Sequence, residues 1–193
     1  MYFLLNAVAF FGLYNELYLL YDNEKAVDVM NNAVNIEDRD KTCCFTGHRP
    51  EKLGMEEENL KKLLRKEIRA AVKDGYTTFI SGMAKGVDLI AARVVLEERK
   101  KNGNIRLICA SPYEDFEKGW TDMEREEYRI IMEEADETKY ICEHCFRGCY
   151  QIRNRWMVDN SSRVIAVFNG EKGGTKNTID YALKKGVSIH NII

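Results

Sequence analysis

The 193-residue sequence contains only two prolines, no internal repeat and no low-complexity tract. The scarcity of proline excludes long proline-rich linkers. A strong charge of either sign is also missing, because 29 basic and 31 acidic residues leave a net charge of −2. This near balance argues against a broad nucleic-acid surface, whereas it is compatible with a local site for an anion.

What is present indicates a globular protein. With 45% hydrophobic and 31% charged residues, the chain has the composition and length of one soluble domain of ordinary size. Its charge is unevenly distributed. Residues 1–40 contain seven acidic and two basic residues, whereas residues 41–193 contain 24 acidic and 27 basic residues. We therefore divide the chain into an apolar and acidic N-terminal appendage, 1–40, and a single domain, 41–193.

The stretch Met1–Tyr21 is apolar but lacks the basic start and the small-residue cleavage site of a signal peptide. It reaches the length of a membrane span, yet Asn6, Asn15 and Glu16 interrupt it and no basic residue flanks its start. Three interpretations stay open: an added helix, a membrane anchor, or translated upstream sequence that is not native. We favour an appendage, and we expect a cytoplasmic protein without stable membrane insertion.

From residue 41 onward, short β-branched and apolar runs alternate with stretches whose apolar residues recur at helical spacing. The predicted strands are residues 41–46, 76–80, 105–110, 138–142, 163–168 and 187–193. The predicted helices are residues 56–73, 89–101, 120–134, 149–160 and 175–185. This alternation predicts an α/β fold of the Rossmann-like, doubly wound kind, with a mainly parallel sheet and helices on both faces.

The stretch Ser81-Gly-Met-Ala-Lys-Gly-Val-Asp88 leads from the second predicted strand into a helix. Gly82 lets the backbone turn sharply and approach a ligand, because no Cβ is in the way, and Gly86 allows close packing at the helix start. The first amides of that helix have no internal partner, so they suit a phosphate. Asp88 could accept from a ribose hydroxyl or from the backbone of a neighbouring loop. A plain strand-to-helix turn can also carry two glycines, so this loop is not decisive alone.

Two further loops of the same kind end other predicted strands. Gly47-His48-Arg49-Pro50 follows the first strand, and Asn169-Gly-Glu-Lys-Gly-Gly174 follows the fifth and ends at Thr175, a predicted helix N-cap. In a doubly wound sheet the carboxyl ends of the parallel strands face one side, and ligands bind there where the strand order switches. The three loops are therefore expected to converge.

The chemistry of these loops suits an anion. Arg49 and Lys85 can supply charge-assisted hydrogen bonds, while Gly173, Gly174 and Thr175 offer backbone amides and a hydroxyl. In the alternative interpretation, which needs no ligand, His48 and Arg49 only cap loops and the glycines only allow the backbone to turn. The convergence of three loops favours a nucleotide or nucleotide-like ligand over that interpretation.

Six cysteines fall into two groups. Cys43, Cys44 and Cys109 lie in apolar strands, where cysteine behaves as a small core residue. The second group, Cys142, Cys145 and Cys149 around His144, is spaced like part of a zinc site, but the second pair of ligands is missing nearby. We therefore expect reduced thiols and no metal.

Four motifs occur in order: Phe45-Thr-Gly-His-Arg-Pro50, Ser81–Asp88, Arg153-Asn154 with Met157-Val-Asp159, and Gly173-Gly-Thr175. At these residues the sequence resembles the YpsA-like family of the SLOG superfamily, Rossmann-like nucleotide-binding domains that include DprA and the LOG phosphoribohydrolases. The resemblance covers about residues 41–193 and implies a nucleotide or NAD-derived ligand. The candidate ligand-binding residues are Gly47, His48, Arg49, Ser81, Gly82, Met83, Lys85, Gly86, Asp88, Arg153, Asn154, Asp159, Gly173, Gly174 and Thr175.

The sequence also departs from the motifs of two related groups, the LOG enzymes and the DprA-like proteins. LOG enzymes carry a Pro-Gly-Gly-x-Gly-Thr-x-x-Glu motif whose acid acts on the glycosidic bond, and Thr178 stands at that position here. A threonine cannot replace a carboxylate in this chemistry. DprA-like proteins have a later histidine in the loop motif, and the matching residue is Ala92.

The leading hypothesis is thus a sensor or binding protein without an assigned cofactor. In the alternative, an N-glycoside or phosphoanhydride hydrolase, Arg153 would orient phosphate and Asp88 or Asp159 would act on the sugar. A DprA-like binder of single-stranded DNA is the second alternative, against which the near-neutral charge argues. The sequence leaves catalysis and homo-oligomerisation open.

Deleting residues 1–29 should leave a cooperatively folding, ligand-competent domain, because every predicted strand and candidate site residue lies at residue 41 or later. Thermal unfolding of the shortened and full chains, followed by circular dichroism, checks this expectation. A shortened chain without a cooperative transition would place the appendage in the core.

Overall fold

The computed structural model describes residues 38–193, and the expectations for residues 1–37 lie outside this part of the chain. Six strands form one sheet in the order β4-β3-β2-β1-β5-β6, and every neighbouring pair is parallel. The strands are β1 (Thr42–Gly47), β2 (Thr78–Ser81), β3 (Arg106–Ser111), β4 (Glu137–Tyr140), β5 (Arg163–Val167) and β6 (Ser188–Asn191). The predicted parallel, Rossmann-like sheet is confirmed.

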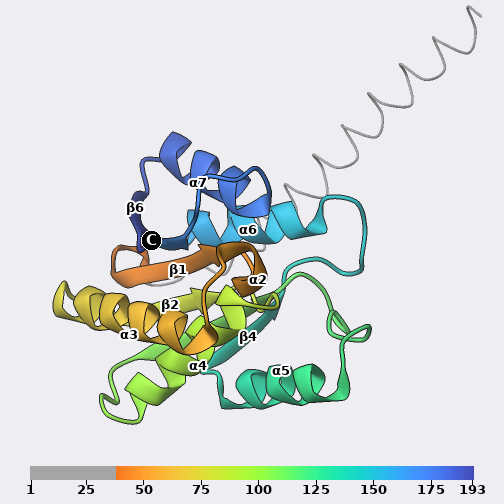
Figure 1. Ribbon diagram of the computed structural model, residues 1–193, viewed down its shortest axis with the longest axis horizontal. Helices are drawn as coiled ribbons and strands as arrows, with labels where there is room; N and C mark the ends of the chain where they lie inside the picture. Colours follow the sequence, from red (N-terminus) through yellow and green to blue (C-terminus); the bar gives the residue numbers. More distant parts are fainter. Residues whose placement is uncertain (1–37) are drawn as a thin grey trace, which may run out of the picture. The chain divides into compact units, whose positions relative to one another are not determined.

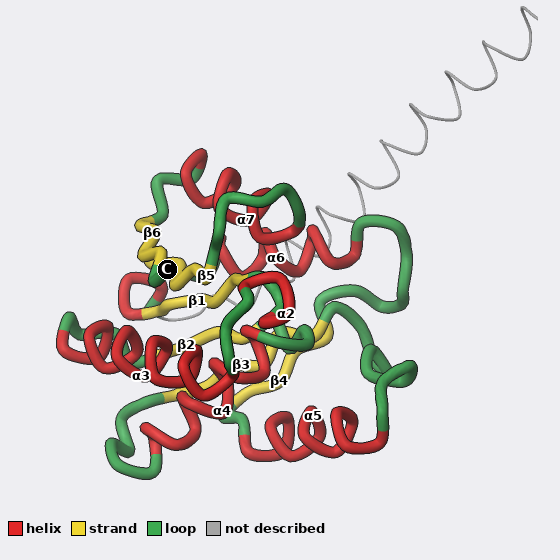
Figure 2. Tube along the Cα trace, viewed as in Figure 1, coloured by secondary structure: helices red, strands yellow, loops and turns green. Residues whose placement is uncertain are grey.

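Helices connect consecutive strands and cover both faces of the sheet (Figures 1 and 2). The connecting helices are α2 (Pro50–Leu53), α3 (Glu57–Lys73), α4 (Val87–Arg99), α5 (Asp122–Glu134), α6 (Cys149–Asp159) and α7 (Gly174–Lys184), and the 3-10 helix η1 (Arg39–Lys41) precedes β1. The connections from β1 to β4 proceed in one direction and place α3, α4 and α5 on one face. The chain then returns to β5 beside β1, so that α6 and α7 cover the other face, as right-handed crossovers require.

The core follows the period-two alternation of the strands. Cys43 and Phe45 point into the cluster under α3 and α4, where Phe45 stacks on Phe79 with ring centroids 6.0 Å apart. Cys44, between them, is also fully buried and faces the opposite side. Cys109 is buried as well, so the expectation that these three cysteines are core residues is confirmed.

The helices obey local sequence signals. The apolar stripe of α3 buries Leu60, Leu64, Ile68 and Ala71, one residue per turn. The first turn of α5 is closed by a capping box, in which the Thr121 side chain accepts from the Glu124 amide and the Glu124 carboxylate accepts from the Thr121 amide.

One short helix, α2, was not predicted, although its signals are present in the sequence. Pro50 stands at its first turn and Gly54 follows it in the left-handed conformation, which is the usual asymmetry of helix ends. Within residues 38–193, no helix is long and apolar enough to cross a lipid bilayer.

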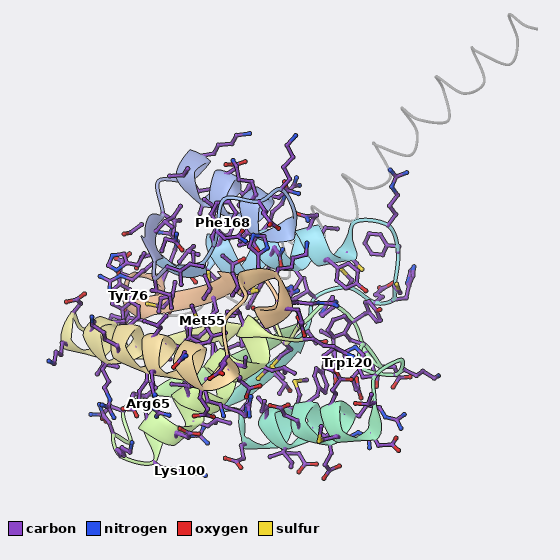
Figure 3. The ribbon with its side chains drawn as sticks, in the orientation of Figure 1. Met55, Arg65, Tyr76, Lys100, Trp120 and Phe168 are labelled. Atoms are coloured by element: carbon purple, nitrogen blue, oxygen red, sulfur yellow. The ribbon has the colours of Figure 1, made fainter. Side chains whose placement is uncertain are left out.

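A buried carboxylate ties α3 to α4 on the outer side of the core. Glu98 is 6% exposed. It accepts from Arg69 Nε (2.7 Å), Arg65 Nη1 (2.9 Å) and Lys101 Nζ (3.2 Å). Arg65 lies where α3 meets α4 (Figure 3). The hydrogen bond from Arg69, followed by those from Arg65 and Lys101, lowers the pKa of Glu98 from 4.5 to about 2, although burial alone would raise it.

A group whose pKa is lower in the folded state than in the unfolded state stabilises the fold at pH values above its unfolded pKa. This stabilisation is lost as the pH falls toward the pKa of the folded state. Glu98 should therefore stabilise the fold fully above about pH 4.5 and progressively less down to about pH 2. Glu98→Gln should lower the free energy of unfolding by roughly 1–3 kcal/mol at pH 7, since its partners are partly solvated. The same substitution should have almost no effect near pH 2.

Urea unfolding of both proteins at pH 7, 4 and 2.5 measures this difference. A constant difference across the pH range would show that Glu98 acts through packing and not through its charge.

Candidate functional site

The loops after β1 and β5 are joined at the point where the strand order switches. Gly47 and Val167 are paired in register at the ends of the two strands. The His48 amide donates to the Val167 carbonyl (3.1 Å), and the His48 ring packs on Phe168 with centroids 5.4 Å apart. Asn169 Nδ2 also donates a hydrogen bond to the Lys52 carbonyl (3.3 Å). A switch in strand order of this kind is where a doubly wound sheet generally binds its ligand.

The end of β1 also touches the start of α4. A Cβ added at Gly47 would lie 2.6 Å from a Val87 methyl carbon, so only glycine fits there. Gly86, the N-cap of α4, has φ of 92°, a left-handed conformation that favours glycine. The contact between Gly47 and Val87 joins the second loop directly to the first. The role of Gly86 in close packing stays a prediction.

The Ser81–Asp88 loop is stabilised by its own side chains. Ser81 Oγ donates to the Asp88 carbonyl (2.8 Å) and accepts from the Met83 amide (3.2 Å). Asp88 Oδ2 accepts from the Ala84 amide (3.2 Å), and Met83 is fully buried with φ of 59°. Asp88 thus accepts a hydrogen bond from a loop backbone, as one of the two expected roles requires. The amide belongs to the same loop as Asp88, however, and not to a neighbouring loop.

The space above Gly82 is filled by Arg153 from α6. Arg153 Nη1 donates to the Gly82 carbonyl and lies 3.4 Å from Asp88 Oδ2. A Cβ at Gly82 would collide with Arg153 Nη1. The close approach that Gly82 permits is thus made here by the guanidinium of the protein itself, and binding of a ligand at Gly82 stays a prediction.

Arg153 and Asp88 form a buried ion pair. Burial is the largest effect on Asp88 and raises its pKa, while Arg153 and the Ala84 amide oppose the rise. Burial likewise lowers the pKa of Arg153, which still remains protonated. Loss of either partner would leave an uncompensated buried charge. Arg153 therefore positions the loop, and its Nε has no hydrogen-bond partner among residues 38–193.

Lys85 does not face the crevice. Its ammonium lies 2.6 Å from Glu124 Oε2 and 5.0 Å from the centre of the Trp120 ring, toward α5. The hydrogen bond from Lys85 is the main reason why the pKa of Glu124 falls to about 2. The expected pairing of Lys85 with a phosphate is therefore not supported by its position. Arg49 is exposed, and its side chain makes no hydrogen bond or ion pair within the described part of the chain.

The loop after β5 ends in exposed glycines. Gly173 is the N-cap of α7, with φ of 151°, and Gly174 is the first helical residue. The expectation that Thr175 is the cap is corrected, since Thr175 is buried in the first turn. Gly174 has no left-handed φ, and a Cβ there would meet nothing within 4 Å. A side chain at Gly174 would thus meet open space, and the amides of residues 174–176 make no hydrogen bond within residues 38–193.

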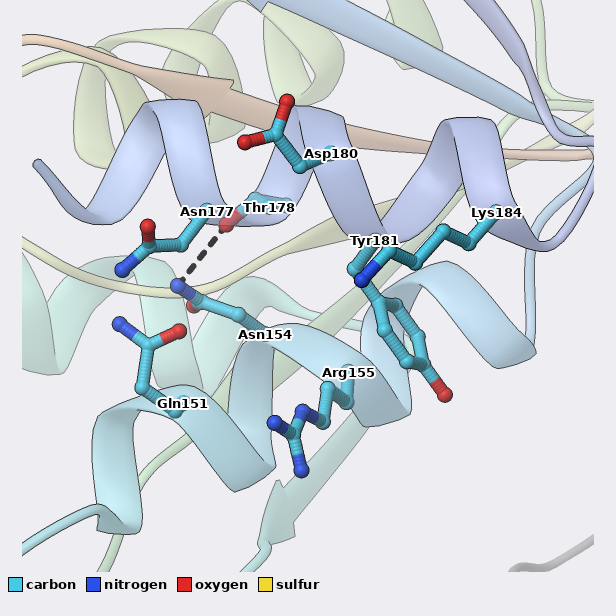
Figure 4. Close-up of a pocket in the computed structure, with 8 residues that line it drawn as sticks. All are labelled: Gln151, Asn154, Arg155, Asn177, Thr178, Asp180, Tyr181 and Lys184. Atoms are coloured by element: carbon cyan, nitrogen blue, oxygen red, sulfur yellow. Dashed lines mark hydrogen bonds between the residues drawn. The ribbon is translucent and has the colours of Figure 1, made fainter. Parts of the chain in front are cut away.

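Side chains from α6 and α7 meet behind this helix start. Asn154 Nδ2 donates to Thr178 Oγ1 (3.0 Å), and Thr178 Oγ1 donates to the Gly174 carbonyl (2.9 Å). The two residues form the floor of a groove of about 330 Å³ between the helices (Figure 4). Its lining residues are Gln151, Asn154, Arg155, Asn177, Thr178, Asp180, Tyr181 and Lys184. Gln151 and Asn177 were not predicted, although Gln151 lies one helical turn before Asn154, on the same face.

A family model described as the YspA SLOG family (YpsA) matches residues 43–192. The chain belongs to this family. A UPF0398 protein of Bacillus thuringiensis (strain Al Hakam) is 31% identical over 159 residues, which cover 78% of this chain and 86% of that protein. A UPF0398 protein of Bacillus cereus (strain AH820) is 30% identical over the same length.

The fold of this SLOG family member is also similar to that of a solved structure. DNA processing protein A from Helicobacter pylori, described for its single-stranded DNA binding mode, matches with a TM-score of 0.55 and 23% sequence identity. The match covers 79% of this chain and 65% of that one, so the present chain spans slightly less than two thirds of its length. At this identity the likeness shows the fold alone.

Asp159 lies at the opposite edge of the sheet from the glycine loops. It is the last residue of α6, which runs antiparallel to the strands and ends before β5 begins. Its carboxylate accepts from the Tyr181 hydroxyl (2.9 Å) and lies 3.4 Å from Lys185 Nζ, and its carbonyl accepts from Arg39 Nε (3.0 Å). This placement does not support the expectation that Asp159 joins the candidate site.

The cysteines around His144 lie between β4 and the start of α6. Cys142 and Cys149 are buried, and Cys145 is exposed. Cys142 Sγ donates to the Cys149 carbonyl at 3.8 Å. Within residues 38–193, no group of three or more His, Cys, Asp or Glu side chains is arranged to hold a metal ion.

Gly47→Ala should destabilise the protein by about 1–3 kcal/mol, because the new methyl group must displace Val87 at the junction of the first two loops. Gly103→Ala is the matched control, since nothing lies within 4 Å of a Cβ there. Its stability should stay within about 0.5 kcal/mol of the wild type. Equal stability of the two variants in urea unfolding would contradict the close contact between β1 and α4.

Proposed function

We propose that this protein binds a nucleotide or an NAD-derived ligand whose phosphate sits at the start of α7. The observation that carries the proposal is the open N-terminus of α7 beside the joined β1 and β5 loops. Free amides and the helix dipole favour an anion at that position. A phosphate there would lie at the switch in strand order, the usual ligand crevice of this fold.

Two side chains of the first loop support the same placement. Arg49 is exposed and unpaired within the described residues, so its guanidinium is free to make a charge-assisted bond to an oxygen anion. His48 is only 6% exposed, and its Nε2 has no hydrogen-bond partner among residues 38–193. Buried polar atoms nearly always have a partner, so a ligand oxygen would satisfy this one.

The geometry favours binding over hydrolysis. At the position of the acid in the LOG enzymes, the Thr178 hydroxyl donates its proton to the Gly174 carbonyl and accepts from Asn154. Asp88 is held by the Ala84 amide and Arg153, while Asp159 lies at the other edge. None of the carboxylates considered for sugar chemistry is therefore free beside the α7 helix start.

Titration calorimetry with AMP, ADP-ribose and NAD tests the proposal, and chromatography of the same mixtures detects any released base or sugar. At least one of the three ligands should bind without conversion. A released product would favour the hydrolase alternative, and salt-sensitive binding of single-stranded DNA in place of the three ligands would favour a nucleic-acid role.

Gly174→Val should weaken binding of the best of these ligands by about tenfold or more, because the side chain occupies the approach to the helix amides. Gly103→Val makes the same change in open space, before β3 and thus at the opposite edge of the sheet. Both variants should remain folded, since neither glycine has a left-handed φ. If Gly174→Val bound the ligand as tightly as the wild type, the phosphate would not be bound at the start of α7.

A further inference from the structure

The groove between α6 and α7 contains three carboxamide side chains whose hydrogen-bonding groups are largely unused. Gln151, Asn154 and Asn177 gather at the end of the groove nearest the N-termini of both helices (Figure 4). Within residues 38–193, the side chains of Gln151 and Asn177 make no hydrogen bond, and that of Asn154 uses only its Nδ2. Their free groups therefore point into a groove that has the volume of a small-ligand site.

The three carboxamide side chains themselves carry no charge. Among residues 38–193, Asp180 is the one acid that lines the groove, and it is paired with Lys176 through contacts of 2.5 and 2.7 Å. Two cations also line the groove, Arg155 and Lys184, and neither forms an ion pair within this part of the chain. Arg155 lies 5.6 Å from the centre of the Tyr181 ring. Neutral carboxamides present a donor and an acceptor side by side, which is the pattern that matches the amino group and the neighbouring ring nitrogen of a base such as adenine.

The groove adjoins the proposed phosphate site. Asn177 lies three residues after Gly174, a separation of about 5 Å along the helix axis. The Thr178 hydroxyl bonds the groove floor to the Gly174 carbonyl, so the two places are rigidly connected. This separation leaves room for one sugar between a phosphate at the helix start and a base in the groove.

We propose that this groove binds the heterocyclic base of the nucleotide, with Gln151, Asn177 and the Asn154 carbonyl oxygen reading its hydrogen-bonding edge. The inference rests on the proposed function, because it needs a phosphate at the start of α7. It assigns base specificity to the outer groove of the α6–α7 pair and not to the glycine loops.

Two probes separate the base from the phosphate: AMP, and ribose 5-phosphate, which lacks the base. Calorimetry should show that Gln151→Ala and Asn177→Ala each weaken AMP by about tenfold and leave ribose 5-phosphate within about twofold. Tyr150→Ala is the matched control on α6. Tyr150 is 44% exposed and stands beside Gln151 in the chain, but its ring contacts Tyr113 and Phe116 instead of lining the groove.

The outcomes are distinct. If both amide variants bind AMP with unchanged affinity, or if only Tyr150→Ala binds it more weakly, the base site is wrong. The proposed phosphate site is not contradicted by either result. Equal losses for AMP and ribose 5-phosphate also overturn it, because the amides would then act on the shared sugar phosphate. If neither probe binds the wild-type protein, the proposed function fails and this inference fails with it.

Discussion

The carboxyl edge of the sheet depends on the buried pair between Arg153 and Asp88. The guanidinium comes from α6 on one face of the sheet, and the carboxylate comes from the first turn of α4 on the other. Their contact fills the gap above Gly82 and fixes the loop that follows β2. Because both charges are largely withdrawn from water, loss of either would leave the other without its counter-charge, and the pair connects the two helical layers at this point.

The candidate site residues fall into two groups, those bonded to other parts of the protein and those that are open to solvent. Arg153, Asp88 and Gly82 hold the framework, and Lys85 is bonded to α5. The open positions lie one strand further along, at the β1 and β5 loops and the start of α7. In the described residues, the motif that is most recognisable in the sequence is thus engaged in contacts within the protein, whereas Arg49, Gly173 and Gly174 in the neighbouring loops are exposed.

The elements could be predicted closely because local signals and the fold agree. The stripe of α3 and the apolar runs of β1 and β5 have no competing pattern, and a one-way alternation of strands and helices leaves few topologies. The partners of polar side chains could not be predicted in the same way. Arg153 and Gly82 are 71 residues apart, and Lys85 and Glu124 are 39 apart, so no local spacing reveals that these contacts form. Asp159 shows a related limit of sequence patterns, because its place at the end of α6 separates it from Arg153 and Asn154, which precede it in the same motif.

The long separation between Arg153 and its loop has a consequence for the order of assembly. A chain still emerging from the ribosome contains the glycine loop well before the helix that supplies its guanidinium, and β5, which completes the crevice, is made later still. Until α6 docks, Asp88 faces a cavity without its counter-charge, and the loop lacks the bond that fixes Gly82. The carboxyl end of the sheet is therefore one of the last parts of the domain to form, so a truncated or half-folded chain carries the sequence motif without the contacts that fix its loop.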